Sequence, residues 1–184
     1  MEVPNATVLL APAEIERGLD RLAARLRPRF SGRKLTVVAV LNGAAIFAAD
    51  LVRRLEPGLQ LEFLRMCSYG SGTAPAHVPE LLLRPDAARV RGRHVLLLDD
   101  ILDTGRTLAG AQEVVRGMGA AGLTSVVLID KTPRRRVPVV LDDRLLQLDR
   151  DAFVVGYGLD HDGLWRNLPA LMALESAALE ASDA

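Results

Sequence analysis

Apolar residues follow two patterns along this chain. Between Ile15 and Leu26 they recur every three or four positions, which predicts a helix over residues 12–27. Between Leu35 and Leu41 they form an unbroken run with β-branched members, which is typical of a strand buried on both faces. The chain therefore offers both helices and buried strands to one fold.

The two patterns alternate through the rest of the sequence. Further helices are predicted at 44–55 and 107–118, strands at 59–66, 93–98, 124–129 and 153–157, and a short helix in the tail at 168–179. Gly119 and Gly122 close the helix before the fourth strand, and the glycines and prolines of residues 69–79 predict a loop. Strands that alternate with helices predict an α/β fold with a mostly parallel sheet flanked by helices.

The composition narrows the class of protein. The 184 residues are enough for one domain with a proper core, and 49% hydrophobic with 25% charged residues is a globular balance. A net charge of zero argues against a nucleic-acid-binding protein. The single cysteine, Cys67, excludes an intrachain disulfide, and no signal peptide or membrane-spanning run is visible. We expect a cytoplasmic protein without nucleic-acid or membrane partners.

Polar segments follow three of the predicted strands. Asn42-Gly43, residues 99–107 and Lys131 each come just after an apolar run. The carboxyl ends of parallel strands share one edge of a sheet, and ligands bind in the crevice beyond that edge. Polar loops after strands are common, but three together, one of them this dense in functional groups, predict a binding site.

The densest of these segments begins with two carboxylates. Asp99 and Asp100 offer the oxygen ligands that a hard divalent cation prefers. Adjacent strand residues point to opposite faces, so both reach one site only if the chain turns there or if one acts through a bound sugar or water. The alternative is that one of them caps a helix or lies in a solvated turn.

The rest of this segment suits a phosphate. Asp103 lies inside the loop, where it could act as a general base or cap the next helix. Thr104 to Thr107 supply hydroxyls and free N–H groups at a helix start, and Gly105 lets the backbone approach a ligand closely. The spacing differs from that of a Walker loop. The segment indicates a site for a metal-bound phosphorylated sugar or nucleotide.

At this point the chain resembles a known family. Residues 95–107, VLLLDDILDTGRT, resemble the motif of the type I phosphoribosyltransferases, which use 5-phosphoribosyl-1-pyrophosphate (PRPP). Four further segments resemble the hypoxanthine-guanine phosphoribosyltransferases in family order: residues 41–53, Ser68-Tyr69, residues 130–134 and residues 153–169. The resemblance implies one domain over residues 1–184, with a core at about 30–150 and a hood over the active site from the N-terminal segment and residues 151–184.

The resemblance also implies a reaction and a role for each site residue. A 6-oxopurine would displace pyrophosphate from PRPP with Mg²⁺ bound, and Asp103 would be the general base near N7 of the purine. PRPP would be bound by Asn42, Gly43, Ser68, Tyr69, Asp99, Asp100, Asp103, Thr104, Gly105, Arg106, Thr107 and Arg166. The purine would be bound by Ile101, Lys131, Phe153, Val154 and Asp160, and the metal by Asp99, Asp100 and Asp160.

Three of these assignments carry a chemical argument of their own. Lys131 has donors only and therefore favours a 6-oxo over a 6-amino purine, although a solvated loop lysine is the ordinary alternative. Phe153 would stack on the purine, with core packing as its alternative. Asn42 stands where many family members carry Lys or Arg, so the predicted pyrophosphate loop has one positive charge fewer.

Other functions remain open on the sequence alone. The chain could be a phosphoribosyltransferase for another base, such as xanthine or a pyrimidine. It could also be a regulator that binds PRPP or a nucleotide without turnover, or an interaction module. Retention of Asp103 argues against a dead site, and the resemblance implies a homodimer or homotetramer.

Overall fold

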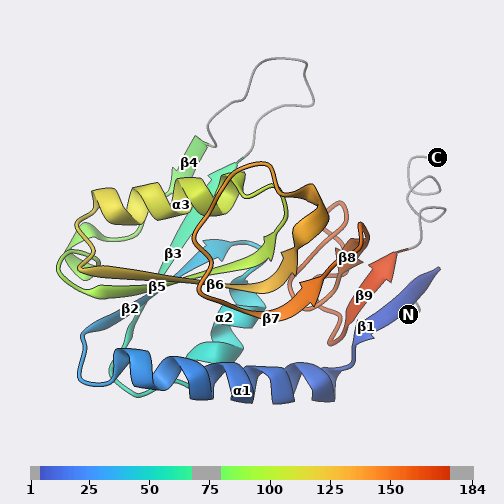
Figure 1. Ribbon diagram of the computed structural model, residues 1–184, viewed down its shortest axis with the longest axis horizontal. Coiled ribbons are helices and arrows are strands. Elements are labelled where there is room, and N and C mark those ends of the chain that lie inside the picture. The colour runs from blue at the N-terminus through green and yellow to red at the C-terminus, as the bar shows by residue number, and fades with distance from the viewer. Residues whose placement is uncertain (1–4, 68–79, 175–184) are drawn as a thin grey trace.

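A six-stranded sheet forms the centre of the molecule (Figure 1). The computed structural model describes residues 5–67 and 80–174. The strands are β2 (Leu35–Leu41), β3 (Gln60–Cys67), β4 (Glu80–Leu83), β5 (His94–Leu102), β6 (Gly122–Lys131) and β7 (Asp143–Leu148). They lie in the order β4-β3-β2-β5-β6-β7, and all pairs are parallel except β3 with β4.

Helices cover both faces of this sheet (Figure 1). α1 (Pro12–Phe30) and α2 (Ala45–Val52) lie on one face, and α3 (Arg106–Gly117) lies on the other. Successive residues of β2 alternate between the two cores: Val37 packs with α1 and α2, whereas Val38 packs with α3. The unbroken apolar run of β2 thus reflects burial on both faces, and the predicted α/β class is confirmed.

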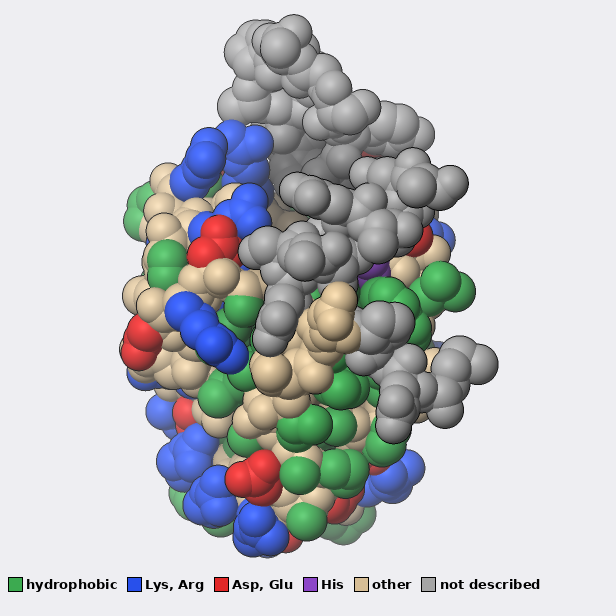
Figure 2. Space-filling model, turned by 90° about the vertical axis from the view of Figure 1, so that its right-hand side faces the viewer, with side chains coloured by type: hydrophobic (Ala, Val, Ile, Leu, Met, Phe, Trp, Pro, Cys, Tyr) green, Lys and Arg blue, Asp and Glu red, His purple; other side chains and the backbone are tan. Residues whose placement is uncertain are grey.

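A second, smaller sheet lies beside the first. It joins β1 (Ala6–Leu10), β9 (Leu171–Leu174) and β8 (Phe153–Val155) in that order, and every pair is antiparallel. Val154 and Leu171 belong to the same core as α1 and α2, so the small sheet packs on the main body. Figure 2 faces this side of the molecule and shows hydrophobic side chains near its centre, with Lys and Arg along its left and lower borders.

The predicted tail helix is wrong where the structure describes it. Leu171–Leu174 is strand β9, and residues 175–179 lie outside the described residues. Short apolar segments do not distinguish helix from strand by spacing, and the partner that decides, β1, comes from the other end of the chain. The strands β1, β4 and β7 were not predicted, and the predicted loop at 69–79 also lies outside the described residues.

Two strands are longer than predicted, and both extensions carry site residues. β5 continues to Leu102, so Asp99 and Asp100 lie within the strand and not after it. β6 begins at Gly122, which therefore opens the strand and does not close the helix, and runs through Lys131. Two short 3₁₀ turns, η1 (Ala87–Arg89) and η2 (Thr132–Arg134), complete the elements. In the described part of the chain, every helix is too short or too polar to cross a membrane.

Candidate active site

The loop after β2 lies directly against β5. Gly43 is buried, and a Cβ on it would overlap the carboxylate of Asp100. Gly158, whose φ is +104°, also packs on Gly43, because a Cβ on Gly158 would overlap the Gly43 carbonyl oxygen. The Leu41–Asn42 peptide is cis, and the Asn42 side chain is exposed. Three segments distant in sequence therefore meet at Gly43. The contact with Asp100 was expected from the shared edge of the sheet, whereas the contact with Gly158 was not predicted.

The two carboxylates of β5 are close neighbours in a dry setting. Asp99 is 3% exposed, and its Oδ1 accepts the Asp100 amide at 3.0 Å. Burial, together with the Asp100 charge, raises the pKa of Asp99 well above its usual value. Burial also raises the pKa of Asp100, while its hydrogen bonds with Asp99 and the Ile101 amide oppose that rise. The two carboxylates therefore resist ionising together unless positive charge lies beside them.

A cavity of about 210 Å³ opens at the start of α3. Gly105 precedes the helix with φ at +89°, and a Cβ there would lie 2.7 Å from the Val137 carbonyl oxygen. The side chain of Arg106 is exposed and is not among the lining residues. The lining contains Asp99, Asp100, Ile101, Leu102, Asp103, Thr104, Gly105, Thr107 and Leu108. Free N–H groups at a helix start and threonine hydroxyls suit a phosphate in this cavity.

The segment after β6 braces this loop. Arg135 donates to the carbonyl oxygens of Asp103 at 3.2 Å and Leu102 at 3.4 Å, and it pairs with Asp130 at 2.5 Å. The amides of Arg136 and Val137 both donate to the Thr104 carbonyl oxygen at 3.0 Å. These contacts hold the loop in shape.

A second cavity of about 200 Å³ adjoins the first. Asp100, Ile101 and Asp103 line both. The remaining lining residues of the second cavity are Lys131, Arg134, Ala152, Phe153, Val154, Leu159 and Asp160. All the residues predicted to bind a purine thus surround one cavity, next to the predicted base Asp103.

Asp103 has a free acceptor at this cavity. Its Oδ1 is buried and has no hydrogen-bond partner among the described residues; its nearest cation is Arg134, with Nε at 3.6 Å. A buried acceptor that lacks a partner is uncommon in proteins. Such an oxygen is suited to accept a proton or hydrogen bond from a bound ligand.

Lys131 enters the cavity from the end of β6. It is 4% exposed, and its ammonium pairs with Asp151 at 2.7 Å. The hydrogen bond from Lys131 lowers the pKa of Asp151 below its usual value. A buried cation with one carboxylate partner retains donors for a ligand.

The small sheet supplies the opposite wall. The Phe153 side chain remains 39% exposed, and its ring centroid lies 5.1 Å from that of His161. Asp160 accepts from Arg166 at 2.6 Å and from the Gly163 amide at 2.8 Å. Arg166 also donates to the Gly158 carbonyl oxygen at 2.7 Å, which fixes the turn that contacts Gly43.

The carboxylates fit Mg²⁺ only in part. Across residues 5–67 and 80–174, no three His, Cys, Asp or Glu side chains are grouped closely enough to hold a metal ion. Asp160, predicted as the third ligand, is held by Arg166 instead. The Asp99–Asp100 pair fits, because a divalent cation would offset the burial and the repulsion that together raise the pKa of Asp99, and Mg²⁺ usually takes its other ligands from water and substrate phosphates.

Some predictions cannot be placed, and some residues were missed. Ser68 and Tyr69 lie outside the described residues. Arg134 and Arg135 were given no role from sequence, although both contact the Asp103 loop. The basic run after Lys131 could have indicated these contacts, but runs of charged residues usually lie on a solvated surface.

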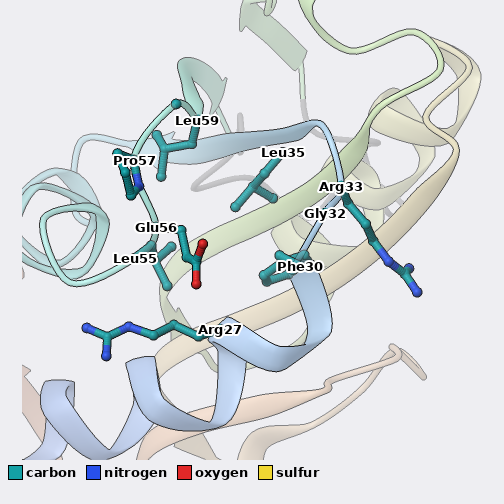
Figure 3. Close-up of a pocket in the computed structure, with 10 residues that line it drawn as sticks. Arg27, Phe30, Gly32, Arg33, Leu35, Leu55, Glu56, Pro57 and Leu59 are labelled. Carbon is teal, nitrogen blue, oxygen red and sulfur yellow. The ribbon is translucent and has the colours of Figure 1, made fainter.

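A further cavity of about 230 Å³ lies at the opposite end of the sheet (Figure 3). It is bounded by the end of α1 and by the segment before β3, and Leu35, the first residue of β2, lines it. In Figure 3 the side chains of Arg27 and Arg33 point away from each other. None of the predicted site residues lines it, and it faces the amino ends of the parallel strands, away from the edge where such sheets bind ligands.

Paired acids at the edge of the sheet, a helix start suited to a phosphate and an adjacent cavity are the features of a nucleotide-forming or nucleotide-binding site. The model of the phosphoribosyl transferase domain matches residues 6–162, and the chain belongs to this family. The resemblance seen in the sequence motifs is therefore confirmed.

Relatives of this chain carry a more specific name. It is 34% identical over 173 residues to the hypoxanthine-guanine phosphoribosyltransferase of Bacillus subtilis, covering 94% of this chain and 95% of the relative. The solved hypoxanthine phosphoribosyltransferase of Staphylococcus aureus matches with a TM-score of 0.86 at 32% identity, covering 93% and 92% of the two chains. That of Trypanosoma cruzi matches with a TM-score of 0.90 at 31% identity, covering 100% and 98%.

Proposed function

We propose that this protein is a purine-salvage enzyme that transfers the 5-phosphoribosyl group from PRPP to hypoxanthine or guanine, giving IMP or GMP and pyrophosphate. The observation that carries the proposal is one cavity that combines Asp103, whose Oδ1 has no hydrogen-bond partner among the described residues, with the buried Lys131 ammonium, beside a cavity suited to a phosphate. Relatives with this name over nearly the whole chain support it.

The proposed chemistry forms one bond and breaks another. N9 of the purine attacks C1′ of the ribose as the bond from C1′ to the pyrophosphate oxygen breaks. Asp103 accepts the proton that the purine loses at N7, because its Oδ1 is an available acceptor in the cavity. Lys131 donates to the 6-oxygen and so selects a 6-oxopurine.

The remaining residues bind and orient. Thr104 to Thr107 hold the 5′-phosphate at the start of α3, while Asp99 and Asp100 hold the ribose hydroxyls and the metal. Bound there, Mg²⁺ would supply positive charge to the departing pyrophosphate. Asn42 and Gly43 present backbone groups to that pyrophosphate, and Ile101, Phe153, Val154 and Asp160 enclose the base. Ser68 and Tyr69, which lie outside the described residues, would bind PRPP.

Three further assignments, of the hood, the oligomeric state and the cellular compartment, complete the proposal. The small sheet of β1, β9 and β8 would be the hood over the active site, within one domain. The active form would be a homodimer or homotetramer, which sedimentation velocity tests directly. The single cysteine fits a reducing cytoplasm as the compartment.

The test is a Mg²⁺-dependent nucleotide-formation assay with PRPP and, in parallel, hypoxanthine, guanine, xanthine, adenine and uracil. Turnover with hypoxanthine or guanine but not adenine is expected, and removal of Mg²⁺ with EDTA should abolish it. Turnover with adenine or uracil alone would overturn the role of Lys131, whereas turnover with xanthine alone would keep that role and change only the base, because xanthine also carries a 6-oxygen. Binding of PRPP without turnover of any base would favour a regulator.

A further inference from the structure

A turn of three left-handed residues joins the two ligand subsites. Gly156, Tyr157 and Gly158 have φ values of +90°, +48° and +104°. This conformation is ordinary for glycine but uncommon for tyrosine. The Tyr157 amide donates to the Leu168 carbonyl oxygen at 2.8 Å and the Gly158 amide to the Arg166 carbonyl oxygen at 2.9 Å, so backbone bonds hold the turn together with the contacts of the Tyr157 side chain. Phe153 to Val155 of β8 precede the turn, and Asp160 follows it.

The tyrosine side chain reaches α2 from this turn. Tyr157 is 6% exposed, and its hydroxyl donates to Asp50 Oδ2 at 2.6 Å. Burial and the Asp50 carboxylate together raise the pKa of the Tyr157 hydroxyl, so it remains a donor at neutral pH. The short distance is that of a strong, charge-assisted hydrogen bond.

The same helix begins at the pyrophosphate loop. Gly43 comes two residues before α2, and Gly158 packs so closely on its carbonyl oxygen that no Cβ fits between them. The turn therefore contacts α2 near both of its ends. Near Asp50, Arg54 pairs with Glu16 and with Asp20 and so fixes the end of α2 to α1.

We propose that Tyr157 and Asp50 are a positioning pair. Their hydrogen bond couples ligand binding at the pyrophosphate loop, residues 42–43, to the geometry of residues 153–160, which form one wall of the base cavity. Neither side chain lines either ligand cavity. The pair therefore acts through Gly43 on one side and through residues 153–160 on the other. A ligand that orders residues 42–43 then also orders residues 153–160, and the reverse must hold by thermodynamic linkage. This inference rests on the proposed function, because it takes the two subsites to be those of pyrophosphate and the purine nucleotide.

The test is calorimetric titration of IMP, in excess Mg²⁺, with and without saturating pyrophosphate. For the unmodified protein we expect pyrophosphate to change IMP affinity by about fivefold or more, a typical size for coupling between sites. Tyr157→Phe keeps the ring but removes the hydroxyl, and the ratio should fall to within about twofold of one. Asp50→Ala should do the same, and the two changes together should have no larger effect than either alone.

Two variants separate positioning from loss of structure. Asp50→Asn keeps an acceptor oxygen for Tyr157 and should restore most of the coupling. Arg53→Gln removes the exposed partner of Asp50 on the other side and should leave the coupling unchanged. Coupling that survives Tyr157→Phe and Asp50→Ala, or no coupling in the unmodified protein, would overturn the inference. Failure of the unmodified protein to bind IMP and pyrophosphate at all would instead refute the proposed function.

Discussion

The base cavity has two walls of different construction. Asp100, Asp103 and Lys131 come from the ends of β5 and β6, two parallel strands in the middle of the large sheet. Phe153, Val154 and Leu159 come from the small antiparallel sheet and the turn that follows it. The first wall carries charge, whereas the second is mostly apolar, with Asp160 as its charged member.

This difference follows from how each wall is supported. Strands in the middle of a parallel sheet are hydrogen-bonded on both sides and packed on both faces, so they can fix buried carboxylates and an ammonium in place. The small sheet is assembled from short strands near the two described ends of the chain. We therefore expect substitutions in the charged wall to have larger effects on catalysis than substitutions in the apolar wall.

Replacement of Asp103 by Asn should have the largest effect. The amide cannot accept the purine proton, so turnover should fall by about 10² to 10⁴, the usual contribution of a general base. PRPP affinity, measured by calorimetry in Mg²⁺, should stay near that of the unmodified protein because the Thr104 to Thr107 loop is unchanged. Unchanged turnover would remove Asp103 from the mechanism.

Replacement of Lys131 by Ala should act on the base and not on PRPP. A hydrogen bond to a charged group contributes about 1.5–3 kcal/mol, so the KM for hypoxanthine should rise about 10- to 100-fold. The KM for PRPP should change little. Asp151→Asn is the matched control, because it breaks the ion pair at an exposed carboxylate yet leaves the Lys131 ammonium in place. It should change the KM for hypoxanthine by less than about threefold. Equal rises in both KM values would contradict contact with the base.

Replacement of Phe153 by Leu tests the apolar wall. The variant keeps an apolar side chain but loses the aromatic face, and a ring-stacking contact is worth about 0.5–1.5 kcal/mol. The KM for hypoxanthine should therefore rise roughly threefold to tenfold. Phe63→Leu is a matched control, because Phe63 is 38% exposed, compared with 39% for Phe153, and lines neither ligand cavity. Equal KM values for the two variants would show that Phe153 does not stack on the purine.

The two walls also differ in how well the sequence predicts them. The central strands are long apolar runs, so β2 was predicted with its observed bounds, and β5 and β6 were located although both run longer than predicted. The predicted purine residues gather in one cavity, although their roles remain predictions. A continuous pattern over many residues is read from local sequence alone.

The small sheet could not be predicted in the same way. β9 was taken for a helix because its partner, β1, is separated from it by most of the chain. The hydrogen bond from Tyr157 to Asp50 joins residues 107 positions apart, and no local sequence pattern predicts it. The brace from Arg135 to the Asp103 loop was missed for the same reason, since it depends on how β6 places the following segment.

A substitution on the large sheet but away from both walls should lower only the free energy of unfolding, and this effect should be smaller than the effects of the three substitutions above. Asp143 on β7 accepts two hydrogen bonds from Arg25 of α1, at 2.7 and 2.9 Å. Burial alone would raise the pKa of Asp143, but the hydrogen bonds from Arg25 and the Arg144 amide, together with the charges of Arg25 and Arg29, outweigh it, and the pKa lies below its usual value. Because Arg25 is about half exposed, Asp143→Asn should lower the free energy of unfolding by only about 0.5–1 kcal/mol at pH 7.

The pH dependence of that loss follows from the sign of the shift. A carboxylate whose pKa is lower in the folded state stabilises the fold above its unfolded pKa of about 3.9, and this stabilisation disappears as the pH falls through the folded value. Urea unfolding of both proteins should therefore show the difference at pH 7 and lose it in stronger acid, with kcat and KM unchanged at pH 7. A difference that persists below pH 3 would show that Asp143 stabilises the sheet by packing, and altered KM values would show that this edge communicates with the base cavity.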